Sequence, residues 1–187
     1  HPAAERGTKI HDAAERYIKG EEDVLPKELS LFQDAFEDLQ RMHKEGTCVV
    51  EEDWAFDTEW QPTGWFDEDT WGRYKIDAYV KKGNKTIVID FKTGRYAGNE
   101  SSHEAQCALY AAATAYKFPE ATDIQAELWY LDHGKITRHS YTTEQLDARR
   151  KNFHARAMKL STATEYETTP SSYACRWCYF GKEGICR

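Results

Sequence analysis

The segment from Thr86 to Gly94 carries charged side chains in a pattern that could do chemistry. Side chains alternate between the two faces of a strand, so Asp90 and Lys92 project to one side while Ile87, Ile89 and Phe91 enter the core on the other. Asp77 supplies a second carboxylate upstream. Two carboxylates around a divalent cation, with a lysine to position and polarise a water, are what metal-assisted phosphodiester hydrolysis requires. We therefore predict that these three charged groups share one pocket.

Each of these residues also has a purely structural interpretation. Asp77 could lie on the solvent face of its strand beside Lys75, because charged residues are mostly exposed. Asp90 and Lys92 could form an exposed ion pair that contributes little to the stability of the fold. The apolar flanks of the Asp90 strand are those of a central strand, however, and a central strand has no free solvent face. Its charged side is therefore expected to line a cleft.

The elements that must position these groups follow from periodicity and from turn signals. Apolar residues at helical spacing and terminal glycines define two amphipathic helices before the strands. Gly83-Asn84 and Asp132-His133-Gly134 are turn signals, and Thr142 with Gln145 has the spacing of a capping box. In chain order we expect helices over Thr8–Lys19 and Pro26–Lys44, strands over Cys48–Phe56, Tyr74–Val80 and Lys85–Phe91, a helix over His103–Tyr116, a hairpin around Asp132-His133-Gly134, and a helix from Thr142 to about Lys159.

Composition limits the classes of protein that fit. A chain of 187 residues with 40% hydrophobic content is long enough for one domain with a proper core. It contains no apolar run long enough for a membrane span, and its start lacks the order of a signal peptide, so we expect a cytoplasmic protein. A formal charge of -7 argues against a protein that coats DNA by neutralising many phosphates. An enzyme that meets phosphate through a cation remains compatible with that charge.

Four short motifs occur in an order typical of a known family. They are Gly7-Thr8-Lys9-Ile10-His11, Lys75-Ile76-Asp77, Ile89-Asp90-Phe91-Lys92-Thr93-Gly94 and Gln106-Cys107-Ala108-Leu109-Tyr110. Together they resemble the PD-(D/E)xK nuclease superfamily, and within it the RecB-like branch, which includes exonucleases of bacteriophage recombination systems and CRISPR-associated RecB-type nucleases. The resemblance implies an α/β fold with a restriction-endonuclease-like core, in which helices flank a central mixed β-sheet. One nuclease domain would then span 1–187, with N-terminal helices (1–46), a catalytic sheet and motif helix (47–141), and a C-terminal helix with a cysteine-bearing tail (142–187).

The resemblance also implies roles for the motif residues. His11, Asp77, Asp90 and the Phe91 carbonyl would hold one or two Mg²⁺ or Mn²⁺ ions, and Lys92 would help to activate water. Gln106 and Tyr110 lie four residues apart on one helical face, which suits an amide and a phenol that orient the substrate or the lysine. The alternative is purely structural. His11 would then be a core histidine with a satisfied hydrogen bond, and Gln106 and Tyr110 would form a packed polar edge of their helix.

The resemblance implies an acidic residue near the metals on the first strand as well. Glu51 and Glu52 both lie there, and strand alternation lets only one of them face inward. We prefer Glu51.

The tail holds Cys175, Cys178 and Cys186 in metal-ligand spacing. RecB-like relatives with an iron–sulfur cluster combine three such cysteines with one near the start of the domain, but no cysteine precedes Cys48 here. A 4Fe-4S cluster, a zinc ion and free thiols all remain open, as does an upstream segment that carries the missing ligand. A disulfide is disfavoured by the odd cysteine count and the absence of a secretion signal.

Substrate contacts are predicted from aromatic and basic residues. Trp60 and Trp65 lie in a loop longer than a hairpin needs, and exposed aromatics can stack on unpaired bases. Arg95, Arg149 and Arg150 could contact the DNA backbone, together with Lys151, Arg156 and Lys159. Apolar packing of the loop and a solvated helix face are the alternatives.

These observations favour a Mg/Mn-dependent deoxyribonuclease, specifically an exonuclease in DNA recombination, repair or phage DNA processing. Its partners would be DNA, single-stranded or as a duplex with an end, and recombination or replication proteins; it would act in the host cytoplasm if phage-encoded. The alternatives are an inactive nuclease-fold protein that binds DNA or a partner, and an interaction module built on a metal-binding cysteine tail. Cleavage mode, polarity, strand preference and oligomeric state stay open at this point.

Overall fold

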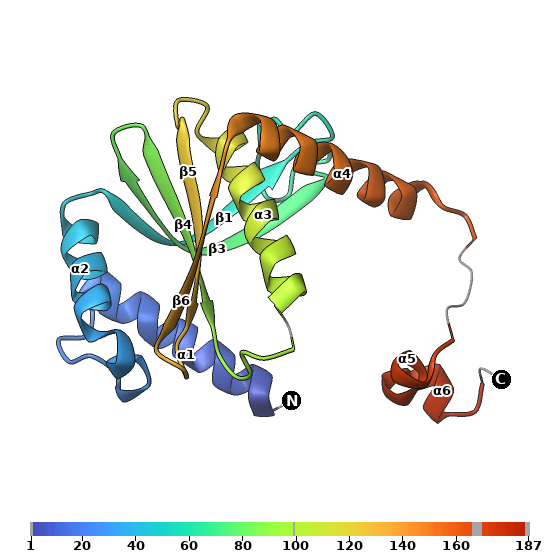
Figure 1. Ribbon diagram of the computed structural model, residues 1–187, viewed down its shortest axis with the longest axis horizontal. Coiled ribbons are helices and arrows are strands. Elements are labelled where there is room, and N and C mark those ends of the chain that lie inside the picture. Colours follow the sequence, from blue (N-terminus) through green and yellow to red (C-terminus); the bar gives the residue numbers. More distant parts are fainter. Residues whose placement is uncertain (1, 99, 166–169, 186–187) are drawn as a thin grey trace. The chain divides into compact units, whose positions relative to one another are not determined.

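The computed structural model describes residues 2–98, 100–165 and 170–185 (Figure 1). The chain divides into two compact units, His1–Phe153 and His154–Arg187, which are described separately. The first unit contains the sheet and the candidate site. The expectation of a single domain over 1–187 stays a prediction.

A six-stranded sheet in the order β2-β1-β3-β4-β5-β6 forms the centre of the first unit. Only β4 and β5 pair in parallel, and the other neighbours are antiparallel, so the sheet is mixed. A parallel pair needs a crossover connection, and helix α3 supplies it. The strands are β1 (Cys48–Phe56), β2 (Pro62–Thr63), β3 (Gly72–Lys82), β4 (Lys85–Lys92), β5 (Asp123–Tyr130) and β6 (Lys135–Tyr141).

Helices cover both faces of this sheet (Figure 1). On one face, α1 (Pro2–Lys19), a 3₁₀ helix (Lys27–Phe32) and α2 (Gln33–Lys44) pack on one buried apolar cluster. On the other face, α3 (Glu100–Lys117) and the first turns of α4 (Thr143–Thr162) pack on a second. The predicted α/β class, with a mixed sheet flanked by helices, is confirmed.

One predicted helix is interrupted. The sequence pattern predicts one continuous helix over Pro26–Lys44, but the chain forms the 3₁₀ helix first and leaves helical geometry at Phe32 (φ −124°, ψ 25°) before α2 begins. This break lets the Phe32 ring stack on Trp129 with centroids 5.5 Å apart. Tertiary packing therefore overrides the local helical pattern at this position.

In strands β1 and β3, the alternation of side chains between the two faces of the sheet reverses at one shared position. In β1, Val50 packs on the α1–α2 side, whereas Trp54 packs on the α3 side, although both positions are even-numbered. In β3, Ile76 and Ala78 show the same reversal. The reversal in β1 falls at Glu51, which has left-handed backbone geometry with φ 51°.

Strands β3 and β4 separate beyond one pair of residues. Their ladder ends at the pair Ala78 and Ile89. Asp77, which precedes Ala78, and Asp90, which follows Ile89, are the first residues beyond it. Beyond this point β3 continues to pair with β1, and β4 continues to pair with β5. The opening between the two diverging strands is where the charged residues of the motif gather.

The remaining segments are short. The reciprocal bonds of Thr142 and Gln145 form the predicted capping box at the start of α4. The second unit contains the end of α4, α5 (Ser172–Trp177) and α6 (Tyr179–Lys182). Across the described parts of the chain, the helices are too short or too polar to cross a bilayer.

Candidate active site

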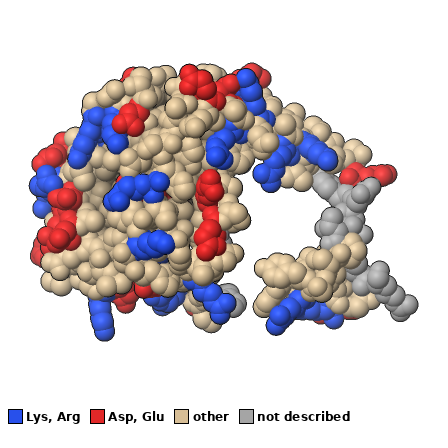
Figure 2. Space-filling view, in the orientation of Figure 1, with Lys and Arg blue, Asp and Glu red and all other residues tan. Residues whose placement is uncertain are grey.

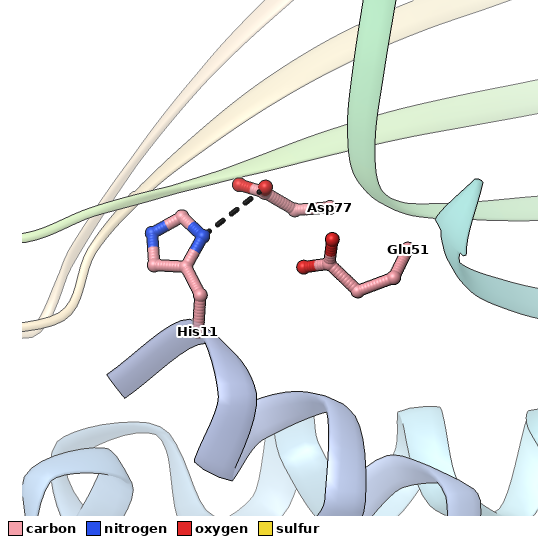
Figure 3. A group of neighbouring side chains, drawn as sticks. All are labelled: His11, Glu51 and Asp77. Carbon is pink, nitrogen blue, oxygen red and sulfur yellow. Dashed lines mark hydrogen bonds and ion pairs between the residues drawn. The ribbon is translucent and has the colours of Figure 1, made fainter. Parts of the chain in front are cut away.

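Three potential metal ligands from three different elements meet beside the diverging strands. His11 comes from α1, Glu51 from β1 and Asp77 from β3, and one ligand atom of each lies within 4.8 Å of the others. His11 Nδ1 is 3.2 Å from Asp77 Oδ1. Figure 3 shows the imidazole and both carboxylates directed into one space. Glu51 itself is exposed, and its left-handed backbone accompanies the direction of its carboxylate toward His11 and Asp77, while Glu52 instead accepts a hydrogen bond from Trp54 Nε1.

Asp77 joins the two strands where their ladder ends. Its Oδ2 accepts a hydrogen bond of 2.6 Å from the backbone N–H of Phe91, while its Oδ1 faces His11. The side chain is only 12% exposed. The solvent-facing alternative for Asp77 is therefore wrong, because the residue substitutes for a missing ladder bond in the interior.

Asp90 and Lys92 lie on the α3 side of β4 and form a second charged group. Asp90 Oδ2 is 2.6 Å from Lys92 Nζ, and the two side chains are 8% and 19% exposed. An exposed ion pair is therefore excluded. Among the described residues, Lys92 is the only polar partner recorded for this buried oxygen.

Gln106 on α3 connects this pair to the helix. Its Oε1 accepts a hydrogen bond of 2.7 Å from Lys92 Nζ, and its Nε2 donates to Asp90 Oδ1 (3.3 Å) and to the Tyr110 hydroxyl (2.8 Å). The amide thus contacts both charged members of the pair, which fixes the lysine with respect to the carboxylate. The i, i+4 spacing of Gln106 and Tyr110 produces their contact.

Two acidic groups of the site, Glu51 and Asp90, have raised pKa values. Burial and the charge of Asp77 raise the pKa of Glu51 to about 7. Burial and the same neighbour raise the pKa of Asp90, although Lys92 and His11 oppose that change. Burial lowers the pKa of His11, but the hydrogen bond to Asp77 and the nearby carboxylates outweigh burial and raise it overall. The site therefore holds more negative charge than its own cations balance.

This donor set fits a hard divalent cation. Mg²⁺ and Mn²⁺ prefer carboxylate and carbonyl oxygens, and neutral imidazole is also accepted when carboxylates complete the shell. His11, Glu51 and Asp77 offer one such atom each. Asp90 is not one of these three, but its charge interacts with both Asp77 and His11. The chemistry of these residues is that of a divalent metal site.

The two tryptophans that were predicted to stack on DNA bases, Trp60 and Trp65, differ in burial. Trp60 is only 1% exposed and packs among Phe56, Tyr74 and Tyr116, so its prediction as a base-stacking residue is wrong. Its loop covers one end of the sheet, and the ring fills the core beneath. Trp65 is half-buried, with Lys75 Nζ 5.1 Å above its ring.

The predicted basic residues are dispersed. Arg95 is exposed in the loop after β4. On α4, Arg149 lies over the Tyr141 ring and Arg150 over the Tyr116 ring, where Arg150 also pairs with Asp147. On the face drawn in Figure 2, Lys and Arg are interspersed with Asp and Glu rather than gathered in one patch.

The cysteines fall into two groups. Cys48 and Cys107 are buried, and burial raises the pKa of each thiol to about 12, which is typical of structural cysteines. Cys175 and Cys178 are half-exposed free thiols in the second unit. Cys186 lies outside the described residues, so the predicted cluster or zinc site stays a prediction.

One neighbour of the site was not singled out from the sequence. His103, one turn before Gln106 on α3, has its Nδ1 3.0 Å from the Tyr130 hydroxyl. Burial and the charge of Lys92 lower its pKa. Its position three residues before Gln106, on the same helical face, was the available signal.

Comparison with known proteins places the chain in a family. No curated protein sequence is significantly similar to it. Among solved structures, SSO0001 is 13% identical, with a TM-score of 0.40 over 84% of this chain and 67% of the other. A protein from Eubacterium rectale described as a candidate exonuclease is 11% identical, with a TM-score of 0.43 over 96% of this chain and 80% of the other. These two likenesses are too weak to carry an argument. The model of the PD-(D/E)XK nuclease superfamily matches residues 1–187, and the chain belongs to that superfamily.

Proposed function

We propose that this protein is a Mg²⁺- or Mn²⁺-dependent deoxyribonuclease, and specifically an exonuclease that acts in DNA recombination, repair or phage DNA processing. The observation that carries the proposal is the meeting of His11, Glu51 and Asp77 next to the buried Asp90–Lys92 pair. A family match alone does not distinguish an active enzyme from an inactive relative. An intact donor set with a buried lysine beside it supports the active one.

The residues divide into those that hold a cation and those that handle the substrate. His11, Glu51, Asp77 and Asp90 would hold the metal, together with the Phe91 carbonyl that the family pattern adds. When bound, the cation would polarise a phosphoryl oxygen and lower the pKa of a water. Asp77 also fixes the Phe91 peptide through its backbone N–H.

Lys92 is the group that would act on the reacting phosphate. Its ammonium is held by Asp90 and Gln106, so it is oriented before substrate arrives. An oriented ammonium can hydrogen-bond the attacking water and stabilise the negative charge that develops on the phosphoryl oxygens. Gln106 and Tyr110 would keep this ammonium in place, and Trp65, Arg95, Arg149 and Arg150 remain proposed DNA contacts.

The proposal is tested by incubating the purified protein with end-labelled DNA in chelator, in Mg²⁺ and in Mn²⁺. Cleavage that requires a divalent ion supports it, and full activity in excess chelator refutes the metal mechanism. Matched linear and covalently closed circular DNA then separate the two cleavage modes. An exonuclease degrades the linear molecules alone, whereas equal cleavage of circles refutes the exonuclease assignment.

A further inference from the structure

The turn between β5 and β6 contacts two separate parts of the candidate site. Asp132 in this turn accepts two hydrogen bonds from the guanidinium of Arg6, with distances of 2.9 Å and 2.6 Å to its two oxygens. Asp132 Oδ2 also accepts one of 2.6 Å from the backbone N–H of Gly94. One carboxylate therefore ties α1 to the loop that follows the Asp90–Lys92 strand.

The same turn holds the loop through further contacts. His133 Nε2 lies 2.8 Å from the Gly94 carbonyl oxygen, and the backbone N–H of Leu131 donates to the Lys92 carbonyl at 2.9 Å. Gly94 has φ 91°, a backbone conformation that residues with a side chain rarely adopt. The backbone after Lys92 is thus held at Lys92 and at both polar groups of Gly94.

Helix α1 approaches this loop closely on the face that carries His11. A Cβ placed on Gly7 would lie 3.2 Å from Thr93 Oγ1, which is tighter than ordinary contact. Gly7 and His11 are four residues apart and so share one face of α1. Any shift of α1 away from the loop therefore moves His11 relative to Asp77.

We propose that Arg6 and Asp132 are positioning residues that set the affinity of the site for its divalent cation, by holding the helix of His11 against the loop that follows Lys92. This inference rests on the proposed function, because it assumes a metal site at His11, Glu51 and Asp77. An exposed ion pair contributes little to global stability. A geometric role differs, because loss of groups that orient metal ligands typically costs 10–100-fold in affinity or activity.

Helix α1 offers a matched control pair. Arg16 Nε lies 2.6 Å from Glu22, and the two side chains are 45% and 35% exposed, against 50% and 25% for Arg6 and Asp132. Arg16→Ala therefore removes a similar ion pair from the same helix without touching the loop. The comparison between the two pairs separates positioning from general helix stabilisation.

The experiment measures the Mn²⁺ affinity of the full chain by calorimetry or electron paramagnetic resonance, with no DNA present. We expect Arg6→Ala and Asp132→Asn to bind Mn²⁺ about tenfold more weakly, and Arg16→Ala to bind it as the wild type does. The double variant should bind Mn²⁺ no more weakly than Asp132→Asn, since both substitutions break the same contact between Arg6 and Asp132. Arg6→Gln serves as a second variant if Arg6→Ala fails to fold.

The outcomes distinguish this inference from the proposed function. If Arg6→Ala, Arg6→Gln and Asp132→Asn all bind Mn²⁺ as tightly as Arg16→Ala in an enzyme that cuts DNA, the positioning role is refuted and the nuclease stands. If the wild type binds Mn²⁺ in a manner that depends on Arg6 and Asp132 but cuts no DNA, the nuclease proposal fails and the positioning role stands.

Discussion

Glu51 and Asp77 occupy the same position in the register of β1 and β3, between the paired residues Val50 and Ala78 on one side and Glu52 and Ile76 on the other. At this position both strands exchange the faces that their side chains meet. Two carboxylates are thereby placed side by side next to His11. The local irregularity of the sheet and the candidate metal site are the same feature.

Glu51 should make the metal-free protein less stable at high pH. Its pKa is raised in the folded chain to about 7 by burial and by Asp77, so between about pH 4.5 and 7 the folded state binds more protons than the unfolded state. The free energy of unfolding therefore falls as pH rises through this window. Glu51→Gln cannot ionise and should remove the loss.

Because Glu51 is exposed, solvent screens its interactions and keeps the effect small. We expect metal-free Glu51→Gln to melt slightly above the wild type at pH 8 and at the same temperature at pH 4, as measured by circular dichroism in chelator. Mn²⁺ should raise the melting temperature of the wild type more than that of the variant, because the variant lacks one charged ligand. If the melting temperatures of the wild type and Glu51→Gln differ by the same amount at every pH, the role of this carboxylate is contradicted.

The Asp90–Lys92 pair is expected to be required for cleavage. Asp90→Asn removes the charge that pairs with Lys92, and Lys92→Ala removes the ammonium, so each should lower kcat by about 10²–10³-fold or more. Asp53→Asn is the matched control, since Asp53 pairs with Lys75 on the neighbouring strand at an exposed position. Single-turnover cleavage of labelled DNA measures the effect, and a folded Lys92→Ala variant with wild-type rates would refute the assignment.

The sidedness of Asp90 and Lys92 was predictable because β4 is a regular strand, in which alternation holds. The position of Glu51 was favoured from the sequence, but its left-handed backbone was not foreseen, since a glutamate carries no signal for positive φ. The break at Phe32 was missed because tertiary packing on Trp129 produces it, and β2 was missed because two residues are too few for a periodic pattern. Arg6 and Asp132 lie 126 residues apart, so nothing local in either motif indicated their contact.

Trp60 and Trp65 should respond differently to substitution, although the sequence places them in one loop. Trp60→Ala empties a fully buried site and should cost about 3–5 kcal/mol of unfolding free energy. Trp65→Ala removes a half-buried ring with Lys75 above it, and should cost less than about 1 kcal/mol. Urea denaturation of both variants measures the difference.

Among folded variants, the substitution of Trp65 should weaken DNA binding more than the substitution of Trp60. Loss of a stacking side chain typically costs about 1–3 kcal/mol per base, so Trp65→Ala should weaken the binding of single-stranded DNA in chelator. The conservative Trp60→Phe should leave that binding unchanged. Fluorescence anisotropy decides between them, and unaltered binding by Trp65→Ala would remove Trp65 from the proposed DNA contacts.

Gln106 should act on the rate of cleavage through Lys92. Gln106→Ala leaves the ammonium with Asp90 as its remaining partner in this group, so the lysine can rotate away from the reacting phosphate. We expect kcat to fall about 10–100-fold with little change in KM. Tyr110→Phe removes the hydroxyl that Gln106 Nε2 contacts and should produce a smaller decrease.

The control for this prediction is Gln33→Ala, which removes an exposed glutamine that bonds Glu37 on α2. A purely structural role of Gln106 would lower the melting temperature and leave kcat and KM of the folded variant at their wild-type values. An orienting role instead lowers kcat at an unchanged KM, because the Lys92 ammonium loses the amide oxygen that holds it. A Gln106→Ala enzyme with wild-type kcat would show that the lysine is oriented by Asp90 alone.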